Sequence, residues 1–226
     1  MNVLFDLDGT LTDPKVGIIG CFKYALDALR IASPEDRELE RFIGPPLRES
    51  FSMLLRTVNG GLVEQAVTLY RERFATVGMF ENNLYSGIGD ALAQLRDSGA
   101  SLFVATSKPG VFAERIVQHF GLSQFFRAVH GSELDGSKAA KRDLIAHVLR
   151  AESLSPSETL MIGDRAHDVF GAKANGVFSV GVLWGYGSAE ELATAGAGVL
   201  CEKPEMLVEA VSILTPHAFQ IDFFSR

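Results

Sequence analysis

The chain has 226 residues, enough for one large domain or for a medium domain with a smaller one. Hydrophobic residues make up 47% of it and charged residues 22%, a composition typical of a globular protein with a packed core. A net charge of −7 without a basic cluster disfavours nucleic acid as a partner. No apolar run approaches membrane-spanning length, and no basic segment precedes an apolar stretch near residue 1. We therefore expect a cytoplasmic protein with no membrane partner.

The two cysteines, Cys21 and Cys201, are far apart and lack the close spacing of a metal site. Disulfides are rare in the reducing cytoplasm. We therefore predict two buried, reduced thiols.

A short apolar run, residues 3–5, ends in two carboxylates one residue apart, Asp6 and Asp8. In a strand, residues two apart point the same way, so both acids leave on one side while Leu7 turns into the core. Two carboxylates this close repel unless a cation or a shared proton lies between them. Gly9 allows a sharp turn and a close approach to a ligand. The stretch predicts either a metal site or a strand followed by an Asp/Gly-rich turn.

After Pro14, which can open a helix, apolar side chains recur at helical spacing from about residue 16 to 31. Two more helices are predicted over Leu47–Val58 and Leu62–Val77. No stretch between residues 16 and 82 has a strand pattern. We expect this segment to be an all-helical insertion.

From residue 83 onward, strand and helix patterns alternate. The predicted strands are Ala100–Ala105, Arg127–His130, Thr159–Ile162, Phe178–Val182 and Ala197–Leu200. The predicted helices are Ile88–Asp97, Lys108–Phe120, Ala139–Arg150, Ala166–Asn175, Ala189–Ala195 and Pro204–Leu214. This alternation predicts an α/β fold with a parallel sheet and helices on both faces.

Polar residues follow three predicted strands at the edge where open parallel sheets bind ligands. Asp6 and Asp8 end the first strand, Thr106-Ser107-Lys108 the second and Gly163–Asp168 the third. A lysine-bearing segment, Gly136–Lys141, lies between the last two. An acidic pair, a hydroxyl, a lysine and a second acidic pair, in this order at strand ends, favour a joint functional role.

Each part also has a structural interpretation. Thr106 or Ser107 could cap the helix that begins near Pro109. Asp164 could cap the helix after the third strand, and Asp168 lies one turn further on, where helix N-termini favour acids. The combination is therefore more informative than any one member.

The order of these motifs resembles that of the haloacid-dehalogenase-like (HAD) phosphohydrolases over the whole chain. The strongest matches are Phe5–Leu11, FDLDGTL, and Ile162–Asp168, IGDRAHD. The helical insert after the first motif, with Phe42–Leu47 and Gly181–Gly187, is similar to the phosphoglycolate-phosphatase-like branch. His167 is assigned no role.

The resemblance implies two structural units. A Rossmann-like core domain would comprise residues 1–15 and 83–226, and an inserted helical cap domain residues 16–82. A cap over the sheet edge can close on the substrate and exclude water.

The resemblance also implies a Mg²⁺-dependent phosphomonoester hydrolase that acts on a small phosphorylated metabolite through an aspartyl-phosphate. Asp6 would be the nucleophile, and Asp8 the general acid and then the general base. Mg²⁺ would be held by Asp6, the backbone carbonyl of Asp8 and Asp164, with waters completing the coordination. Asp168 would be a further ligand or would orient a metal-bound water.

Thr106, Ser107 and Lys141 would bind the phosphoryl group of the substrate. Relatives often have Lys-Pro-x-Pro in the third motif, whereas Lys141 is followed by residues 142–145, RDLI. Taken alone, Lys141 and Lys138 are solvated helix lysines. The spacing to the last motif favours Lys141 as the active-site lysine.

The corner Gly44–Arg48 is the only rigid turn marked by glycine and proline in the insert. We predict that it faces the active site, with Arg48 in contact with the leaving group. A surface loop with a solvated arginine is the alternative.

Phosphoglycolate is the leading substrate by resemblance, followed by a nucleoside monophosphate, as in a 5'-nucleotidase, or a phosphotyrosine-like substrate. A phosphomutase uses the same parts. A dehalogenase is disfavoured because that branch lacks the second aspartate that Asp8 provides. A phosphonatase is disfavoured because no lysine lies between Lys23 and Lys108 to form a Schiff base in the cap.

A phospho-accepting signalling module is the alternative of another class, because it also pairs aspartates, a hydroxyl and a lysine on a parallel sheet. There the acidic pair precedes an acceptor aspartate on a later strand, and no helical insert follows the first strand. The order in this chain argues against it. A monomer and a homodimer both stay open, and the apolar tail Ala218–Phe224 either packs on the core, docks on a partner or frays.

Overall fold

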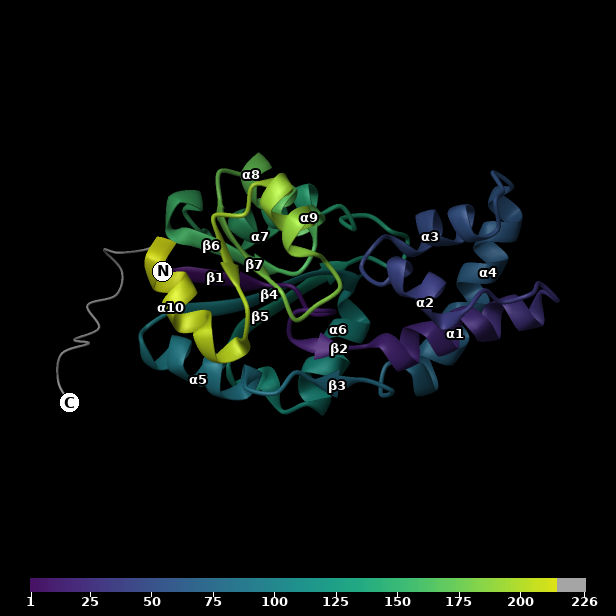
Figure 1. Cartoon of the computed structure of the whole chain (residues 1–226), viewed down its shortest axis with the longest axis horizontal. Helices are drawn as coiled ribbons and strands as arrows, with labels where there is room; N and C mark the ends of the chain where they lie inside the picture. Colours follow the sequence, from purple (N-terminus) through teal and green to yellow (C-terminus); the bar gives the residue numbers. More distant parts are fainter. Residues whose placement is uncertain (215–226) are drawn as a thin grey trace.

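The structure is a computed structural model that describes residues 1–214. Six parallel strands form one sheet in the order β5-β4-β1-β6-β7-β8 (Figure 1). The strands are β1 (Asn2–Phe5), β4 (Ser101–Pro109), β5 (Phe126–Ser132), β6 (Thr159–Gly163), β7 (Phe178–Val182) and β8 (Val199–Cys201). The α/β fold with a parallel sheet, predicted from the alternation of patterns, is confirmed.

Helices cover both faces of this sheet (Figure 1). One face carries α7 (Lys141–Ala151), α8 (Ala166–Ala174) and α9 (Ala189–Ala195), drawn above the sheet. The other face carries α5 (Ile88–Asp97), α6 (Gly110–His119) and α10 (Leu207–Leu214), drawn below it. A parallel sheet covered in this way is buried on both sides, which explains the continuous apolar runs of its strands.

Strand β1 lies in the middle of the sheet, and its side chains alternate between the two faces. Leu4 packs with Phe103 and Met161 in the cluster beneath α7 and α8. Val3 and Phe5 point the other way, into the larger apolar cluster. All three β1 side chains are fully buried, so the residues that follow β1 start from a rigid support.

Four helices lie together at the end of the molecule beyond the carboxyl edge of the sheet (Figure 1). They are α1 (Lys15–Ala28), α2 (Asp36–Leu39), α3 (Leu47–Leu54) and α4 (Gly60–Arg73), and α4 continues into a π-helical turn, Phe74–Gly78. Their apolar interior is centred on Phe22. The centre of its ring lies 5.0 Å from the ring centre of Phe51 and 5.1 Å from the ring centre of Tyr70. These side chains belong to the same apolar cluster as Val3 and Phe5, so the core continues from the sheet into the helices.

Two short strands connect the four helices to the rest of the chain. Strands β2 (Thr12–Asp13) and β3 (Asn83–Leu84) pair antiparallel at the two ends of the helical segment. The sequence analysis did not predict them, because two-residue strands carry no periodic pattern.

Several element boundaries differ from the prediction by a few residues. Strand β4 extends to Pro109, which is paired with Ser132 of β5, so α6 begins at Gly110 rather than at Lys108. Helix α4 begins at Gly60 because the side chain of Asn59 accepts hydrogen bonds from the first free amides of the helix. Helix α7 begins at Lys141, which places this lysine at its first position.

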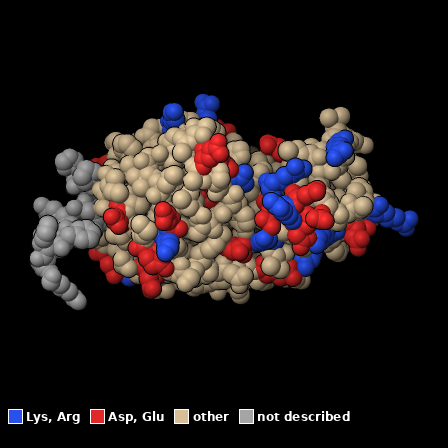
Figure 2. Space-filling model, viewed as in Figure 1, with Lys and Arg blue, Asp and Glu red and all other residues tan. Residues whose placement is uncertain are grey.

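Both cysteines are buried and free, as predicted. No helix among residues 1–214 is both long and apolar enough to cross a membrane. On the side shown in Figure 2, lysine and arginine are interleaved with acids. They gather mainly over helices α1–α4, on the right. The predicted apolar tail, Ala218–Phe224, lies outside the described residues.

Candidate active site

The turn after β1 presents the first two acids. The carbonyl of Leu7 accepts hydrogen bonds from the amides of residues 10, 11 and 12, so the chain folds back within a few residues. Gly9 has φ +80°, a conformation that favours glycine. Leu7 is fully buried, as predicted, and acts as the anchor of the turn.

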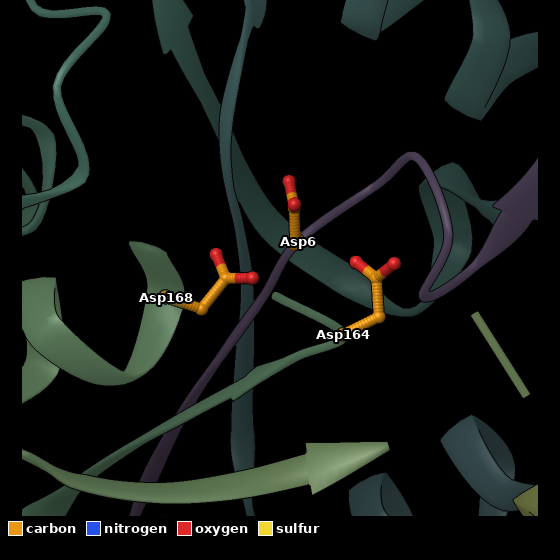
Figure 3. Close-up of side chains that lie close together, drawn as sticks. All are labelled: Asp6, Asp164 and Asp168. Carbon is orange, nitrogen blue, oxygen red and sulfur yellow. The ribbon is translucent and has the colours of Figure 1, made fainter. Parts of the chain in front are cut away.

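Three buried carboxylates meet at this edge of the sheet (Figure 3). Asp6 follows β1, Asp164 follows β6 and Asp168 lies in the first turn of α8. One carboxylate oxygen from each residue lies within 4.8 Å of those from the other two. The sheet thus brings together acids separated by about 160 positions in the chain, as the strand-end argument predicts.

Lys141 neutralises part of this negative charge. Its Nζ lies 2.8 Å from Oδ1 of Asp6 and 2.7 Å from Oδ1 of Asp168, and it donates to the carbonyl of Ala105 at 3.0 Å. Lys138 instead pairs with Glu133. The side chain that reaches the acids is therefore Lys141, the lysine that the spacing favours.

Asp168 also stabilises the N-terminus of α8, the structural role that the sequence analysis left open for it. Its Oδ2 accepts a hydrogen bond from the amide of Arg165 at 3.1 Å, which closes the N-terminus of α8. The same side chain thus fixes a helix end and contacts Lys141. The role at the helix N-terminus and the role in the candidate site therefore do not exclude each other.

Thr106 and Ser107 differ in their surroundings. Thr106 is buried, and its hydroxyl oxygen accepts from the amide of Lys108 at 3.3 Å. Neither residue caps α6, whose N-terminal flanking residue is Pro109. Ser107 lines the cavities described below, whereas Thr106 lines neither.

Asp8 does not belong to the three-acid cluster and contacts a lysine to which the sequence analysis gave no role. Oδ2 of Asp8 lies 2.8 Å from Nζ of Lys108, and both side chains are largely buried. The ammonium group of Lys108 also lies 4.3 Å from the ring centre of Phe74 in the π-helical turn. The position of Lys108 in the sequence, directly after Thr106-Ser107, was the feature that could have indicated a role in the site.

A loop after β7 holds Asp164 in place. The amide of Tyr186 donates to Oδ2 of Asp164 at 2.8 Å, and the indole of Trp184 donates to the carbonyl of Thr10 at 2.9 Å. At Gly185, a Cβ atom would lie 2.3 Å from the carbonyl oxygen of Gly9 and 2.4 Å from Cβ of Asp164. Only glycine fits between the first and last motifs, a requirement that the sequence analysis missed.

The buried acids have raised pKa values. Burial raises the pKa of Asp164 well above its ordinary value, and the charges of Asp168 and Asp6 add to the rise. Burial also raises the pKa of Asp8 and of Asp168, against the opposing effects of Lys108 and Lys141 respectively. Burial would lower the pKa of Lys141, but Asp168 and Asp6 outweigh it, and the net shift is upward.

The residues present suit a hard divalent cation. Oδ1 of Asp164 is buried and accepts no hydrogen bond from the described residues. An unpartnered buried carboxylate oxygen is costly, and a bound cation removes that cost. The three nearby donors are all carboxylates, the ligands that Mg²⁺ prefers.

Two cavities open beside these groups. One of about 380 Å³ is lined by Asp8, Lys108 and the corner Gly44–Arg48. A second of about 420 Å³ is lined by Asp6, Lys141 and Asp168. Ser107 and Pro46 border both cavities, so the two cavities are adjacent, next to the segment of helices α1–α4.

Arg48 lies at the cavity beside Asp8, on the corner predicted to face the active site. Its guanidinium is already engaged: Nε and Nη2 contact the carboxylate of Glu64, and Nη1 donates to the carbonyl of Asp135 at 2.6 Å. The contact between Arg48 and a leaving group therefore stays a prediction. In that contact the guanidinium of Arg48 would remain bound to Glu64.

Comparison with known proteins places the chain in a family. A family model described as "Haloacid dehalogenase-like hydrolase" matches residues 3–182. The chain belongs to this family. The matched segment contains the turn after β1, Lys141 and the acids Asp164 and Asp168.

Three named relatives differ in what they are called. A 5'-nucleotidase of Pseudomonas aeruginosa is 49% identical over 191 residues, 84% of this chain and 86% of that protein. The tyrosine-protein kinase PtkA of Mycobacterium tuberculosis is 43% identical over 189 residues, 83% of this chain. The chain spans only 64% of the length of PtkA. A phosphoglycolate phosphatase of Vibrio cholerae is 26% identical over 219 residues, 93% of this chain and 96% of that protein.

A solved structure agrees with these relationships. The crystal structure of a predicted phosphatase from Clostridium acetobutylicum has a TM-score of 0.89 and 41% sequence identity, covering 93% of this chain and 97% of that one. Fold, motif order and relatives together identify the chain as a phosphatase of the HAD family.

Proposed function

We propose that the protein is a Mg²⁺-dependent phosphomonoester hydrolase that acts on a small phosphorylated metabolite through an aspartyl-phosphate on Asp6. The observation that supports this best is the three-acid cluster with Lys141 between Asp6 and Asp168. Asp6, Asp164 and the backbone carbonyl of Asp8 would hold Mg²⁺, and Asp168 would complete or orient that set. When bound, the cation would offset the negative charge of the acids and of the phosphoryl oxygens.

Asp6 would attack phosphorus. Its Oδ1 accepts from the amide of Leu7 at 2.8 Å and contacts Lys141, whereas no described residue donates a hydrogen bond to Oδ2. In the first step Oδ2 forms a bond to phosphorus and the bond to the leaving oxygen breaks. Thr106, Ser107 and Lys141 would hold the equatorial oxygens, where negative charge spreads in the transition state.

Asp8 would act as the general acid and then as the general base. Its carboxyl borders the cavity that adjoins the acid cluster, and its raised pKa favours the protonated form that a general acid needs. Asp8 donates its proton to the leaving oxygen in the first step. In the second step it takes a proton from water, the water oxygen bonds to phosphorus, and the bond to Asp6 breaks to release inorganic phosphate.

The helical segment of residues 16–82 would act as a cap domain on a core formed by residues 1–15 and 83–226. Hydrogen bonds from Arg48 and Arg71 to the carbonyls of Asp135 and Leu134 connect the helices to the loop after β5. Such a lid can exclude water from the reaction. The leaving group would lie in the cavity between the two parts.

Phosphoglycolate-like esters are the first substrate candidates. The cavity beside Asp8, at about 380 Å³, lies within the usual size range of small-molecule sites. A nucleoside 5'-monophosphate is the second candidate, favoured by the relative that is 49% identical and named 5'-nucleotidase. Comparing kcat/KM for phosphoglycolate and for a set of nucleoside monophosphates decides between them.

The test of the proposal is phosphate release from a panel of phosphate esters with Mg²⁺. We expect activity from the wild type and a loss of roughly a thousandfold or more in Asp6→Asn, because the amide is not a nucleophile. Asp143→Asn removes an exposed acid from α7 and serves as the matched control with wild-type activity. Equal rates for wild type and Asp6→Asn would remove the assigned nucleophile.

A further inference from the structure

The cavity beside Asp8 has a polar end and an apolar wall. Asp8, Ser107 and Lys108 lie at the end nearest the acid cluster. The wall is formed by aromatic side chains: Phe22, Phe42, Tyr70, Phe74 and Phe112. Besides Lys108, two further cations border this space, Arg48 and Arg71 from the helical segment.

The two arginines differ in how their charge is balanced. Arg48 has a carboxylate partner, Glu64, which raises its pKa. Arg71 has none among residues 1–214: its one hydrogen bond goes from Nη2 to the carbonyl of Leu134 at 2.6 Å. Burial lowers the pKa of Arg71, and the nearby charge of Arg48 lowers it further. The carboxylate of Glu64 acts in the opposite direction, but it is bound by Arg48, so Arg71 has no carboxylate of its own among residues 1–214.

A structural role explains only part of this arrangement. Arg71 lies in the last turn of α4, where a cation is favoured by the helix dipole. A side chain that served only this purpose could extend into solvent. Arg71 is instead half-buried at the cavity, and a guanidinium has five N–H donors, of which the Leu134 carbonyl takes one.

The acids near Arg71 do not replace a partner. Glu49, Glu133 and Asp135 also border the cavity, but all three are exposed. Glu133 pairs with Lys138, and Asp135 accepts a hydrogen bond from the amide of Ser137. Glu64 is held by Arg48. Asp8 is held by Lys108.

We infer that Arg71, supported by Arg48, binds a second anionic group of the substrate, carried by the leaving group at the end away from the transferred phosphoryl group. The substrate class would be phosphate monoesters that bear a carboxylate or a second phosphate. An arginine fork suits both groups, because each presents two oxygens in one plane. This inference rests on the proposed hydrolysis at Asp6, since it concerns the leaving group of that reaction.

The test uses the full chain with Mg²⁺ and matched series of esters. The first series contains alkyl phosphates of increasing length, the second the same esters with a terminal carboxylate, beginning with phosphoglycolate, and the third the corresponding bisphosphates. p-Nitrophenyl phosphate and a nucleoside monophosphate complete the panel. The second and third series separate a carboxylate from a phosphate as the second anion.

We expect wild type to favour the doubly anionic ester over its uncharged counterpart at one chain length. Arg71→Gln should reduce that preference roughly 10- to 100-fold, mainly through KM, because a charge-assisted hydrogen bond is lost. Arg71→Lys should restore part of it, because it keeps the charge without the fork. Arg150→Gln, on the exposed end of α7, is the control that leaves the preference unchanged.

Three results would overturn the inference alone. The first is hydrolysis of p-nitrophenyl phosphate without a preference for a second anion at any chain length of the esters. The second is a clear preference for the nucleoside monophosphate. The third is an equal loss in Arg71→Gln for both members of a matched pair. Failure of wild type to hydrolyse any ester would overturn the proposed function, and this inference with it.

Discussion

Asp164 is the acid whose surroundings hold a negative charge least well. It is 1% exposed, its Oδ1 accepts no hydrogen bond from residues 1–214, and its pKa is well above the ordinary value. In metal-free protein near neutral pH, an ionised Asp164 would therefore cost stability. In the proposed function, a cation bound by Asp164 would offset this cost.

The pH dependence of stability follows from this shift. A group whose pKa is raised on folding contributes stability below its unfolded pKa, near 3.8, and loses that contribution as pH rises through the folded value. Asp164→Asn keeps the acceptor for the Tyr186 amide and removes the charge. Without metal, we expect the variant to have a higher Tm than wild type at pH 8 and a much smaller advantage near pH 4.5.

Magnesium should reverse the order of the Tm values of wild type and Asp164→Asn. At a Mg²⁺ concentration about a hundred times its Kd, wild type should gain about 2.7 kcal/mol, or roughly 5–10 °C in Tm, and Asp164→Asn much less. Thermal denaturation with EDTA and with Mg²⁺ measures both effects, with Asp143→Asn as the control. A Tm difference that is independent of pH, with equal gains from Mg²⁺, would contradict the account.

At the scale of elements, α1 packs closely against the π-helical turn, Phe74–Gly78. A Cβ atom on Gly17 would lie 1.9 Å from the carbonyl oxygen of Gly78. The amide of Gly17 also donates to the carbonyl of Glu81 at 3.0 Å. The π-helical turn also carries Phe74, whose ring lies beside Lys108. The packing of α1 thus positions a side chain next to the partner of Asp8.

Gly17→Ala should destabilise the protein by about 1–3 kcal/mol, because the obstructing atom belongs to the backbone and cannot rotate away. For a chain of this size the loss corresponds to roughly 2–12 °C in Tm. Gly89→Ala in α5 is the matched control: no atom lies within 4 Å of its Cβ, so we expect a gain of about 0.4–1 kcal/mol. Equal Tm values for the two variants would show that the α1 contact is not tight.

How far the sequence predicts these elements depends on the length of the pattern. Strand β7 and helices α5 and α9 match their predicted limits, because an apolar run or a helical period defines them. Strands β2 and β3 were missed, since two residues hold no period. Residue type and position after a strand predicted the acids, whereas Lys141 was favoured by its spacing to the last motif of the resemblance.

The missed residues of the site depend on tertiary contacts. Lys108 was seen at its strand end, but its pairing with Asp8 depends on how the turn after β1 faces β4. Gly185 matters only because its loop passes between Gly9 and Asp164, which are distant in sequence. The charge partner of Arg48, Glu64, likewise follows from the packing of α3 on α4.

At the scale of the molecule, the helical segment and the sheet meet through side chains that reach backbone carbonyls. Arg165, from the last motif, donates to the carbonyl of Ile43 and pairs with Glu191 at 3.0 Å in each case. Arg48 and Arg71 reach the loop after β5. The proposed leaving-group cavity is therefore bordered by residues from both parts of the chain.

The central claim is that Asp6 carries the phosphoryl group during turnover, and trapping that intermediate tests it most directly. Asp8→Asn is treated with p-nitrophenyl phosphate and Mg²⁺, because that leaving group needs no acid while removal of the base slows attack by water. After an acid quench, mass spectrometry examines the tryptic peptide of residues 1–15. The account predicts one phosphoryl group on Asp6, and none when Asp6→Asn is added. Release of p-nitrophenol with an unmodified peptide, or with the phosphoryl group on another residue, would contradict it.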